Sequence, residues 1–282
     1  MSTTGIAVTE PGATGLGAVV TGLDLEAPSP ADADALRRAL LASPMLCIRG
    51  CRATPETFLR LGRVFGRPQR ELMGVLRDPD FPEISLVERE RGISTATGKR
   101  ATFGGHWHTD DSYMAVPCAV TLLYGEVVPP SGGDTSFTNM HAAYEALPAA
   151  LKARIAGLGA IHTYQSRRNL SPVPERSAEE KARTPPVTHP LVRTHPETGR
   201  KALYLNPNRI DHVRGMPLDE GDTLLDELIE RATRPAFVHV HAWAPDDIVI
   251  WDNRCTMHRA SAHEGDHPRR LLRILIEGTV PV

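Results

Sequence analysis

Short apolar runs alternate with amphipathic stretches in the first third of the chain. Residues 45–50 (MLCIRG) form a continuous apolar run that is typical of a buried strand. Residues 28–43 combine proline and aspartate near their start with leucines at helical spacing, which predicts an amphipathic helix. A second helix is expected over 54–66, with Thr54 as its N-cap and Gly66 beyond its end. This third is therefore predicted to mix helices and strands.

The last part of the chain alternates as strands do. Apolar or alternating runs predict strands at 119–129, 236–244, 246–253 and 269–278. Two other stretches have the composition and period of helices, 140–158 and 219–233. Residues 189–206 place a Pro-Glu-Thr-Gly turn between two apolar runs, which predicts a β-hairpin.

The segment from Thr163 to Thr188 is rich in Arg, Pro, Ser and Glu and has no apolar period. A long irregular segment is more often a lid or an ordering loop than part of a core, so we expect a lid or insert at 163–188. No internal repeat or low-complexity linker divides the chain. We therefore predict one domain over residues 1–282.

Composition and charge limit the kinds of partner and the cellular location that we expect. Lys and Arg number 32 against 34 Asp and Glu, a balance that argues against binding to a phosphate backbone. No apolar run approaches the length of a membrane span, and no export signal opens the chain. The four cysteines are scattered, which is typical of free thiols in a reducing cytosol. We expect a cytoplasmic protein that binds neither nucleic acid nor membrane.

A candidate metal site lies in the stretch GGHWHTDDSYM. His108 and Asp110 are two residues apart, so on extended backbone their side chains share one face and can converge on one ion. His258 follows an apolar strand and a short polar turn in the C-terminal β region, and supplies a third ligand. Two histidines and one carboxylate leave open positions on an octahedral iron. Zinc is also compatible with this ligand count.

An arginine cluster follows the third ligand. On a strand Arg269 and Arg273 share a face, whereas Arg270 points to the other side. A buried guanidinium needs an anion, and a dicarboxylic acid would supply one through a bidentate pair. The apolar LLRILI context favours burial of this cluster over a solvated surface position.

These motifs resemble the taurine dioxygenase and 2,4-dichlorophenoxyacetate dioxygenase (TauD/TfdA-like) family of Fe(II)/2-oxoglutarate-dependent oxygenases. WHTD, SGGDT, AYEAL, HPLVRTHPETGRKALYLN, WDNRCTMH and the closing arginine-rich strand occur in the family's order and at similar separations. The resemblance covers most of the chain. It implies a mainly β fold with flanking helices, built on a double-stranded β-helix (jelly-roll) core.

The resemblance also implies the site. The family's metal ligands fall on His108, Asp110 and His258, and its 2-oxoglutarate contacts fall on Thr135 and Arg269. Arg273 matches a second arginine that can face either the co-substrate or an anionic substrate. The reaction implied consumes 2-oxoglutarate and O2, releases succinate and CO2, and hydroxylates a C–H bond of the substrate.

The sequence defines the substrate less closely than it defines the reaction. Asp111 follows the metal carboxylate where the taurine enzyme has an apolar residue, and Arg209 lies near a position that lines the family's substrate pocket. Charged residues at these places favour a small anionic or zwitterionic substrate, contacted by Asp111, Arg209 or Arg273. The family's taurine-contacting histidine has no counterpart near ELMGV, which argues against taurine.

Two other function classes stay open. A zinc-dependent hydrolase on a similar β-barrel would use the same ligands, although it has no need of the dicarboxylate site of Thr135, Arg269 and Arg273. A non-catalytic small-molecule-binding protein could keep the fold, although it has no need of three intact ligands. The sequence leaves open whether the chain forms a homo-oligomer.

Overall fold

The computed structural model describes residues 5–88, 104–170, 173, 175–262 and 267–282. A seven-stranded sheet has the order β1-β2-β3-β13-β5-β15-β4, in which only the β2–β3 pair is parallel. Its strands are β1 (Ala7–Val8), β2 (Ala18–Thr21), β3 (Met45–Ile48), β13 (Ile248–Asp252), β5 (Val120–Val127), β15 (Arg270–Ile276) and β4 (Ile84–Glu88).

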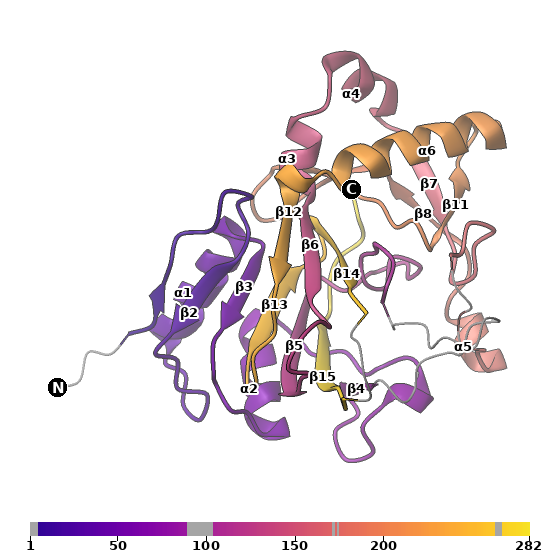
Figure 1. The fold of residues 1–282 in the computed structure, drawn as a ribbon. Helices are drawn as coiled ribbons and strands as arrows, with labels where there is room; N and C mark the ends of the chain where they lie inside the picture. Colours follow the sequence, from indigo (N-terminus) through magenta and orange to yellow (C-terminus); the bar gives the residue numbers. More distant parts are fainter. Residues whose placement is uncertain (1–4, 89–103, 171–172, 174, 263–266) are drawn as a thin grey trace.

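A second, three-stranded antiparallel sheet faces the large one across the middle of the molecule (Figure 1). Its strands are β12 (Val238–His241), β6 (Thr135–Asn139) and β14 (Thr256–Ala260). Phe137 of β6 packs with Val249 and Trp251 of β13, so the two sheets share an apolar interior. The candidate ligand His258 enters this interior, because it lies on β14 opposite Phe137.

Strand β13 is apolar on both faces, which explains its unbroken hydrophobic sequence. Ile248 and Ile250 pack in the cluster that contains the helices α1 (Pro30–Ala42) and α2 (Pro55–Phe65), whereas Val249 and Trp251 point between the sheets. Figure 1 shows α1 and α2 beside the large sheet. Complete burial of each such aliphatic side chain contributes about 1.5–3 kcal/mol.

The predicted ends of α2 are confirmed, whereas α1 is capped by a serine that the sequence analysis did not name. Ser29 caps α1 and Thr54 caps α2, each by accepting a backbone hydrogen bond and closing a capping box. Gly66 follows α2 with φ of 144°, a conformation that a side chain would strain, and a Cβ there would also meet Ile276.

The single helix expected over 140–158 is divided into α3 (Met140–Glu145) and α4 (Ala149–Ile155). Pro148 causes the division, because proline has no N–H to donate and holds the preceding residue away from helical backbone. The helix expected over 219–233 is present as α6 (Leu218–Ala232), above the strands in Figure 1.

The remaining elements form two small sheets. The predicted hairpin is present as β9 (Val192–Thr194) paired with β10 (Lys201–Leu203), and Gly199 adopts φ of 68° in its turn. A separate sheet has the order β11-β7-β8, with strands β11 (Ile210–Val213), β7 (Gly159–His162) and β8 (Val187–Pro190). The described residues also include the 3-10 turns η1 (Gly74–Leu76) and η3 (Pro235–Phe237).

The expected insert at 163–188 contains one short helix, α5 (Ala178–Ala182), which the sequence pattern did not indicate. Residues 171, 172 and 174 of this insert lie outside the described residues. Ser177 caps the helix, and the Glu180 carboxylate accepts a hydrogen bond from the Gly74 amide at 3.4 Å. The insert therefore contacts the segment that precedes β4.

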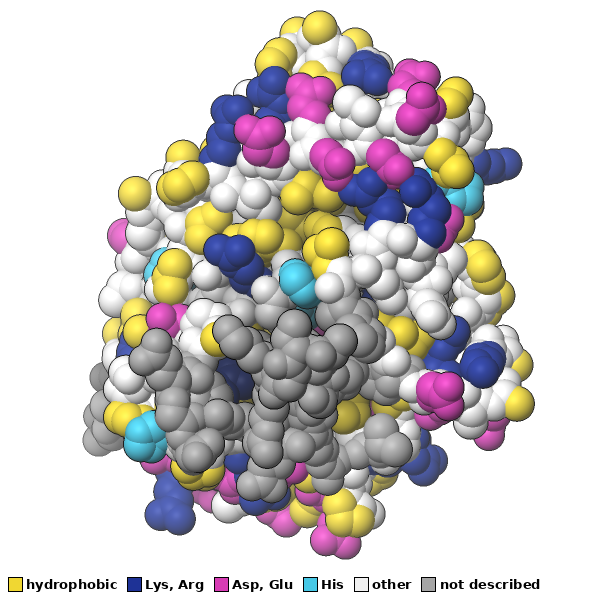
Figure 2. Space-filling view, turned by 45° about the vertical axis from the view of Figure 1, so that its right-hand side comes forward, with side chains coloured by type: hydrophobic (Ala, Val, Ile, Leu, Met, Phe, Trp, Pro, Cys, Tyr) yellow, Lys and Arg dark blue, Asp and Glu magenta, His cyan; other side chains and the backbone are white. Residues whose placement is uncertain are grey.

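Over the described part of the chain, none of the helices is both long enough and apolar enough to span a bilayer. Cys47, Cys51, Cys118 and Cys255 are all free thiols, as the sequence predicted. Figure 2 shows positive and negative side chains interspersed over the upper part of one face rather than gathered into a region of one sign, in keeping with the formal net charge of −2.

Candidate metal centre

His108, Asp110 and His258 converge between the two sheets, as the sequence predicted. The Nε2 atoms of the two histidines each lie 3.9 Å from a different carboxylate oxygen of Asp110. These distances are too long for hydrogen bonds, and the ligand atoms of the group all lie within 4.8 Å of one another. The donor atoms are therefore close enough to bind one ion together.

Backbone pairing between distant segments sets this geometry. His108 and His258 form an isolated antiparallel bridge, with the amide of each donating to the carbonyl of the other at 3.0 and 2.7 Å. Their rings then lie side by side, with centroids 4.1 Å apart. Asp110 follows on the same extended stretch, so its carboxylate reaches the same point.

The protonation states suit a cation. The His108 Nδ1 contacts the His106 carbonyl at 2.8 Å, so this nitrogen carries the proton and Nε2 keeps a free lone pair. Burial lowers the pKa of His108, and burial together with the nearby His108 lowers the pKa of His258 to about 3. Burial alone would raise the pKa of Asp110, but its neighbours, the Arg273 guanidinium and the Thr121 hydroxyl among them, outweigh burial and hold that pKa below its usual value.

Asp110 is oriented by a residue of β5 and by a residue of the turn that follows β13. Thr121 of β5 donates its hydroxyl to the Asp110 carboxylate at 2.7 Å, and the Asn253 side chain accepts from the Asp110 amide at 3.2 Å. Asn253 in turn donates to Thr121 at 2.7 Å and accepts from the Trp251 indole at 3.0 Å. The sequence analysis did not identify Thr121.

A second group of potential ligands, His195 with Asp252 and Cys255, is already satisfied. His195 accepts hydrogen bonds at Nδ1 from the backbone amides of Glu197 and Thr198, so its Nε2 carries the proton that faces Asp252 at 3.0 Å. Asp252 also pairs with Arg254 at 2.6 Å. These contacts hold the turn between β13 and β14, just before His258.

One cavity joins the metal ligands to the arginine cluster. It is lined by Val87, Gly104, His108, Asp110, Leu123, Thr135, Trp251, His258, Ala260, Arg269, Leu271 and Arg273. The three ligands, Thr135 and two of the three arginines therefore share one space, as the sequence predicted. Apart from these polar groups the wall is mostly apolar, which strengthens any charge interaction inside.

Arg269 and Arg270 have opposite surroundings. Among the described residues, the buried Nε atom of Arg269 has no hydrogen-bond partner, and the guanidinium donates to the Gly133 carbonyl at 3.4 Å. Burial lowers the pKa of Arg269 to about 10, so it remains a cation at neutral pH. Arg270 is 44% exposed and pairs with Glu88 and Glu126. Of the two adjacent arginines, Arg270 already has carboxylate partners, whereas Arg269 has none among the described residues and is the one that needs an anion.

Arg273 has a partner that the sequence did not suggest. Its guanidinium lies 2.8 Å from the Glu71 carboxylate and 3.8 Å from Asp110, and it also donates to the Ser85 hydroxyl at 3.1 Å. Nearby carboxylates, Glu71 first, outweigh burial and raise the pKa of Arg273. The charge of Arg273 is thus already partly compensated inside the protein.

Asp111 and Arg209 do not line the cavity, so the structure does not place them with the other candidate residues. Asp111 has φ of 52° and accepts hydrogen bonds from Gln69 at 2.7 Å and from Tyr113 at 3.0 Å. Burial raises the pKa of Asp111 to about 6. Arg209 lies over the rings of Tyr113 and Tyr164 and donates to the Tyr164 carbonyl.

Comparison with known proteins identifies the arrangement. Residues 8–275 match the family model described as taurine catabolism dioxygenase TauD, TfdA family. An alpha-ketoglutarate-dependent 2,4-dichlorophenoxyacetate dioxygenase from Burkholderia sp. (strain RASC) is 34% identical over 254 residues, which cover 87% of this chain and 85% of that protein. The (S)-phenoxypropionate/alpha-ketoglutarate-dioxygenase of Delftia acidovorans is 32% identical, over 95% and 94% of the two chains.

Solved structures agree with these sequence matches. The structure of AAD-2 in complex with Mn(II) and N-oxalylglycine has a TM-score of 0.82 and 34% identity, over 100% of this chain and 99% of that one. A taurine dioxygenase from Burkholderia xenovorans has a TM-score of 0.83 and 31% identity, over 98% and 91%. The likeness extends over nearly the whole chain, and the predicted jelly-roll core is confirmed.

Proposed function

The chain belongs to the TauD/TfdA family and is an alpha-ketoglutarate (2-oxoglutarate)-dependent dioxygenase, and we propose that its Fe(II) is bound by His108, Asp110 and His258. The donor set supports this assignment: two neutral imidazoles and one ionised carboxylate lie around one point and would leave other positions open. When bound, Fe(II) supplies the reaction of O2 with 2-oxoglutarate, which yields succinate, CO2 and an oxidised substrate.

We further propose that Arg269 and Thr135 bind the far carboxylate of 2-oxoglutarate. The observation that carries this proposal is the guanidinium of Arg269, which lines the same cavity as the proposed metal ligands and whose buried Nε has no hydrogen-bond partner among the described residues. A dicarboxylic acid can place one carboxylate at Arg269 and reach the metal with its other end. Thr135 is 2% exposed and adds a hydroxyl at the same wall.

The protein groups around the metal have separate tasks in this proposal. The His106 carbonyl holds the His108 ring in the tautomer that leaves Nε2 free, and Thr121 holds the Asp110 carboxylate. Arg273 lies near Asp110 and helps to keep this carboxylate ionised, and Glu71 anchors Arg273. The apolar side chains Val87, Leu123 and Leu271 keep much of the cavity wall dry.

For the substrate we propose a small organic molecule with a negative group, either an anion or a zwitterion, whose C–H bond is hydroxylated. The relatives named above are dioxygenases of 2,4-dichlorophenoxyacetate and (S)-phenoxypropionate, both carboxylates. Arg209 is the cation we assign to the negative group; its guanidinium is held in place by the rings of Tyr113 and Tyr164 and by the Tyr164 carbonyl. Asp111 and Arg273 would complete the polar side of the substrate site.

Tyr164 of the insert at 163–188 contacts Arg209, which we assign to the substrate site. We propose that the insert covers this site and limits the access of water to it. Tyr164 is buried against Tyr113, with ring centroids 5.1 Å apart, and Arg176 lies over the Tyr164 ring at 4.2 Å.

The four free cysteines support a reducing, cytoplasmic location.

Substrate-stimulated succinate release tests the proposal. The purified protein would be given Fe(II), 2-oxoglutarate and a panel of small carboxylates, sulfonates, sulfate esters and amino-acid derivatives, with the neutral methyl ester of each carboxylate as its matched control. We expect at least one charged compound to stimulate succinate formation more strongly than its ester. Equal turnover of the acid and the ester would refute an anionic or zwitterionic substrate.

A further inference from the structure

Trp243 contacts the wall of the cavity from behind Thr135. Its indole Nε1 donates a hydrogen bond to the Thr135 hydroxyl oxygen at 3.0 Å. Thr135 lines the cavity, whereas Trp243 is not among the lining residues. A threonine hydroxyl can accept two hydrogen bonds and donate one. Because the oxygen already accepts from the indole, the hydroxyl proton must point away from Trp243, and none of the described residues accepts it.

We propose that Trp243 is a positioning residue that directs the Thr135 hydroxyl proton into the cavity, toward the carboxylate bound at Arg269. This inference rests on the co-substrate placement proposed above. The cavity then presents a charged donor from Arg269 and a neutral donor from Thr135 to the same carboxylate. A donor that is already oriented loses less rotational freedom on binding than a free hydroxyl rotor.

Trp243 is itself held in place by its neighbours on β12. Its ring meets that of His241 edge to face, with centroids 4.9 Å apart and planes at 89°. His241 pairs directly with Thr135 in the register of β12 and β6, so the three residues form one local unit. Gly125 leaves room for the indole, because a Cβ at that position would lie 3.1 Å from the Trp243 ring.

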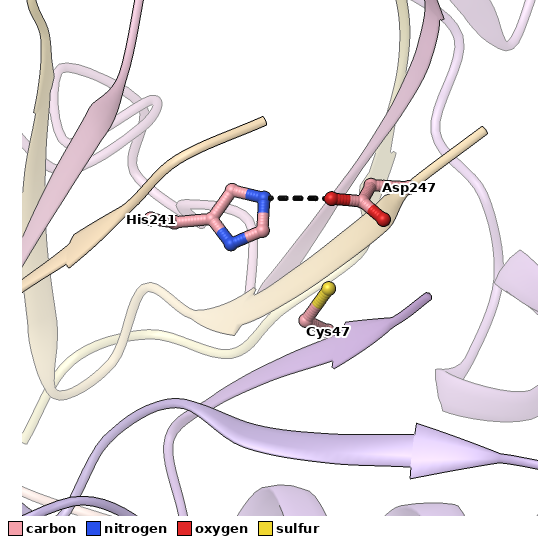
Figure 3. Close-up of side chains that lie close together, drawn as sticks. All are labelled: Cys47, His241 and Asp247. Carbon is pink, nitrogen blue, oxygen red and sulfur yellow. Dashed lines mark ion pairs between the residues drawn. The ribbon is translucent and has the colours of Figure 1, made fainter. Parts of the chain in front are cut away.

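A buried acid lies next to His241, although the His241 Nε2 makes no hydrogen bond among the described residues. Figure 3 shows the His241 ring facing the Asp247 carboxylate, with the Cys47 sulfur beside both; the Nε2 to oxygen distance is 3.3 Å. Asp247 is fully buried and also pairs with Arg49 at 2.9 Å and accepts from the Ala244 amide at 3.0 Å.

The ligand atoms of Cys47, His241 and Asp247 lie within 4.8 Å of one another, so this cluster could in principle bind a metal ion. Its contacts indicate instead that it packs beneath Trp243 and has a structural role. Arg49 already neutralises the carboxylate. Burial, followed by the charge of Asp247, raises the pKa of the Cys47 thiol to about 12, so the thiol stays protonated at neutral pH. We therefore assign this cluster a structural role, packed next to the Trp243 ring through His241.

A double-mutant cycle tests the inference. Trp243→Phe removes the indole donor, and Thr135→Val removes its acceptor; each variant and the double variant would be loaded with Mn(II) and titrated with N-oxalylglycine by calorimetry. We expect Trp243→Phe to weaken binding about 3- to 10-fold, the effect of one neutral hydrogen bond. In the Thr135→Val background the same change should alter affinity less than about twofold. Thr135→Ser, which keeps the hydroxyl, should restore the sensitivity to Trp243→Phe.

A second replacement guards against misfolding of the phenylalanine variant. Benzothienylalanine introduced at position 243 keeps the shape of the ring and replaces only the N–H by sulfur. With Fe(II) it should raise the KM for 2-oxoglutarate by the same 3- to 10-fold and leave kcat unchanged.

The outcomes separate this inference from the proposed function. If Thr135→Val weakens binding but neither replacement at 243 does, or if the effects simply add, Trp243 does not position Thr135, and the inference is wrong while the co-substrate site stands. If Thr135→Val binds N-oxalylglycine as tightly as the wild type, the proposed role of Thr135 and the inference both fail.

Discussion

Replacing Arg269 by methionine would remove the charge that we assign to 2-oxoglutarate while keeping most of the side-chain volume. The guanidinium lines the cavity, and its Nε is buried without a protein partner. A charge-assisted pair with a desolvated carboxylate is worth about 2–5 kcal/mol, so the dissociation constant should rise roughly 30- to 5,000-fold. Arg270→Met is the matched control: this side chain is 44% exposed and already paired with glutamates, so its loss should change affinity less than about fivefold.

The same substitution should have an unusual effect on stability. Removing a buried cation that has no carboxylate partner among the described residues relieves a desolvation cost. We therefore expect the free energy of unfolding of the ligand-free Arg269→Met protein to be no lower than that of the wild type. Calorimetric titration with 2-oxoglutarate and Mn(II), together with urea unfolding, measures both effects. A larger loss of affinity in Arg270→Met than in Arg269→Met would refute the reasoning.

Alanine in place of any one of the three proposed iron ligands should abolish Fe(II)-dependent succinate formation with the circular-dichroism spectrum retained; near wild-type turnover would exclude that residue as a ligand. Arg209→Ala should raise the KM for substrate but leave the affinity for 2-oxoglutarate within about twofold, and the reverse pattern would reassign it. Gly278→Ala should lower Tm, because its Cβ would overlap the Pro117 carbonyl oxygen; an unchanged Tm would contradict this packing. Burial holds the pKa of His162 well below 6.5, so as the pH falls below 6.5 the unfolded chain takes up a proton at His162 before the folded protein does, and the free energy of unfolding should fall. His162→Gln should reduce this fall in unfolding measured against pH, and an identical fall in the variant would contradict the assignment.

The residues that the sequence predicted correctly were those with a local pattern. The capped helices α1 and α2 and the apolar strand β13 follow from periodicity and end signals within a dozen residues. The closeness of His108 and Asp110 also follows from their two-residue spacing, whereas their role as metal ligands stays a prediction. The division of α3 from α4 also had a local signal, Pro148, which the sequence analysis did not use.

The residues that were missed depend on contacts between distant segments. Glu71 and Arg273 are 202 residues apart, and Glu71 lies in a stretch without an apolar period, so nothing local marks it as the partner of a buried arginine. Thr121 lies within an apolar strand, and its hydroxyl gains a role only because β5 passes beside Asp110. The contact of Trp243 with Thr135 likewise requires β12 and β6 to be paired. Such roles become visible only once the sheets are assembled.

Oxygen consumption measured together with succinate formation tests the central claim most directly. The purified protein would be assayed with a substrate from the panel described above, 2-oxoglutarate and either Fe(II) or Zn(II). We expect oxygen uptake that needs both Fe(II) and 2-oxoglutarate, matches succinate one to one, and is absent with Zn(II) and in Asp110→Ala. Substrate conversion that proceeds with Zn(II), or without 2-oxoglutarate and oxygen, would contradict the account.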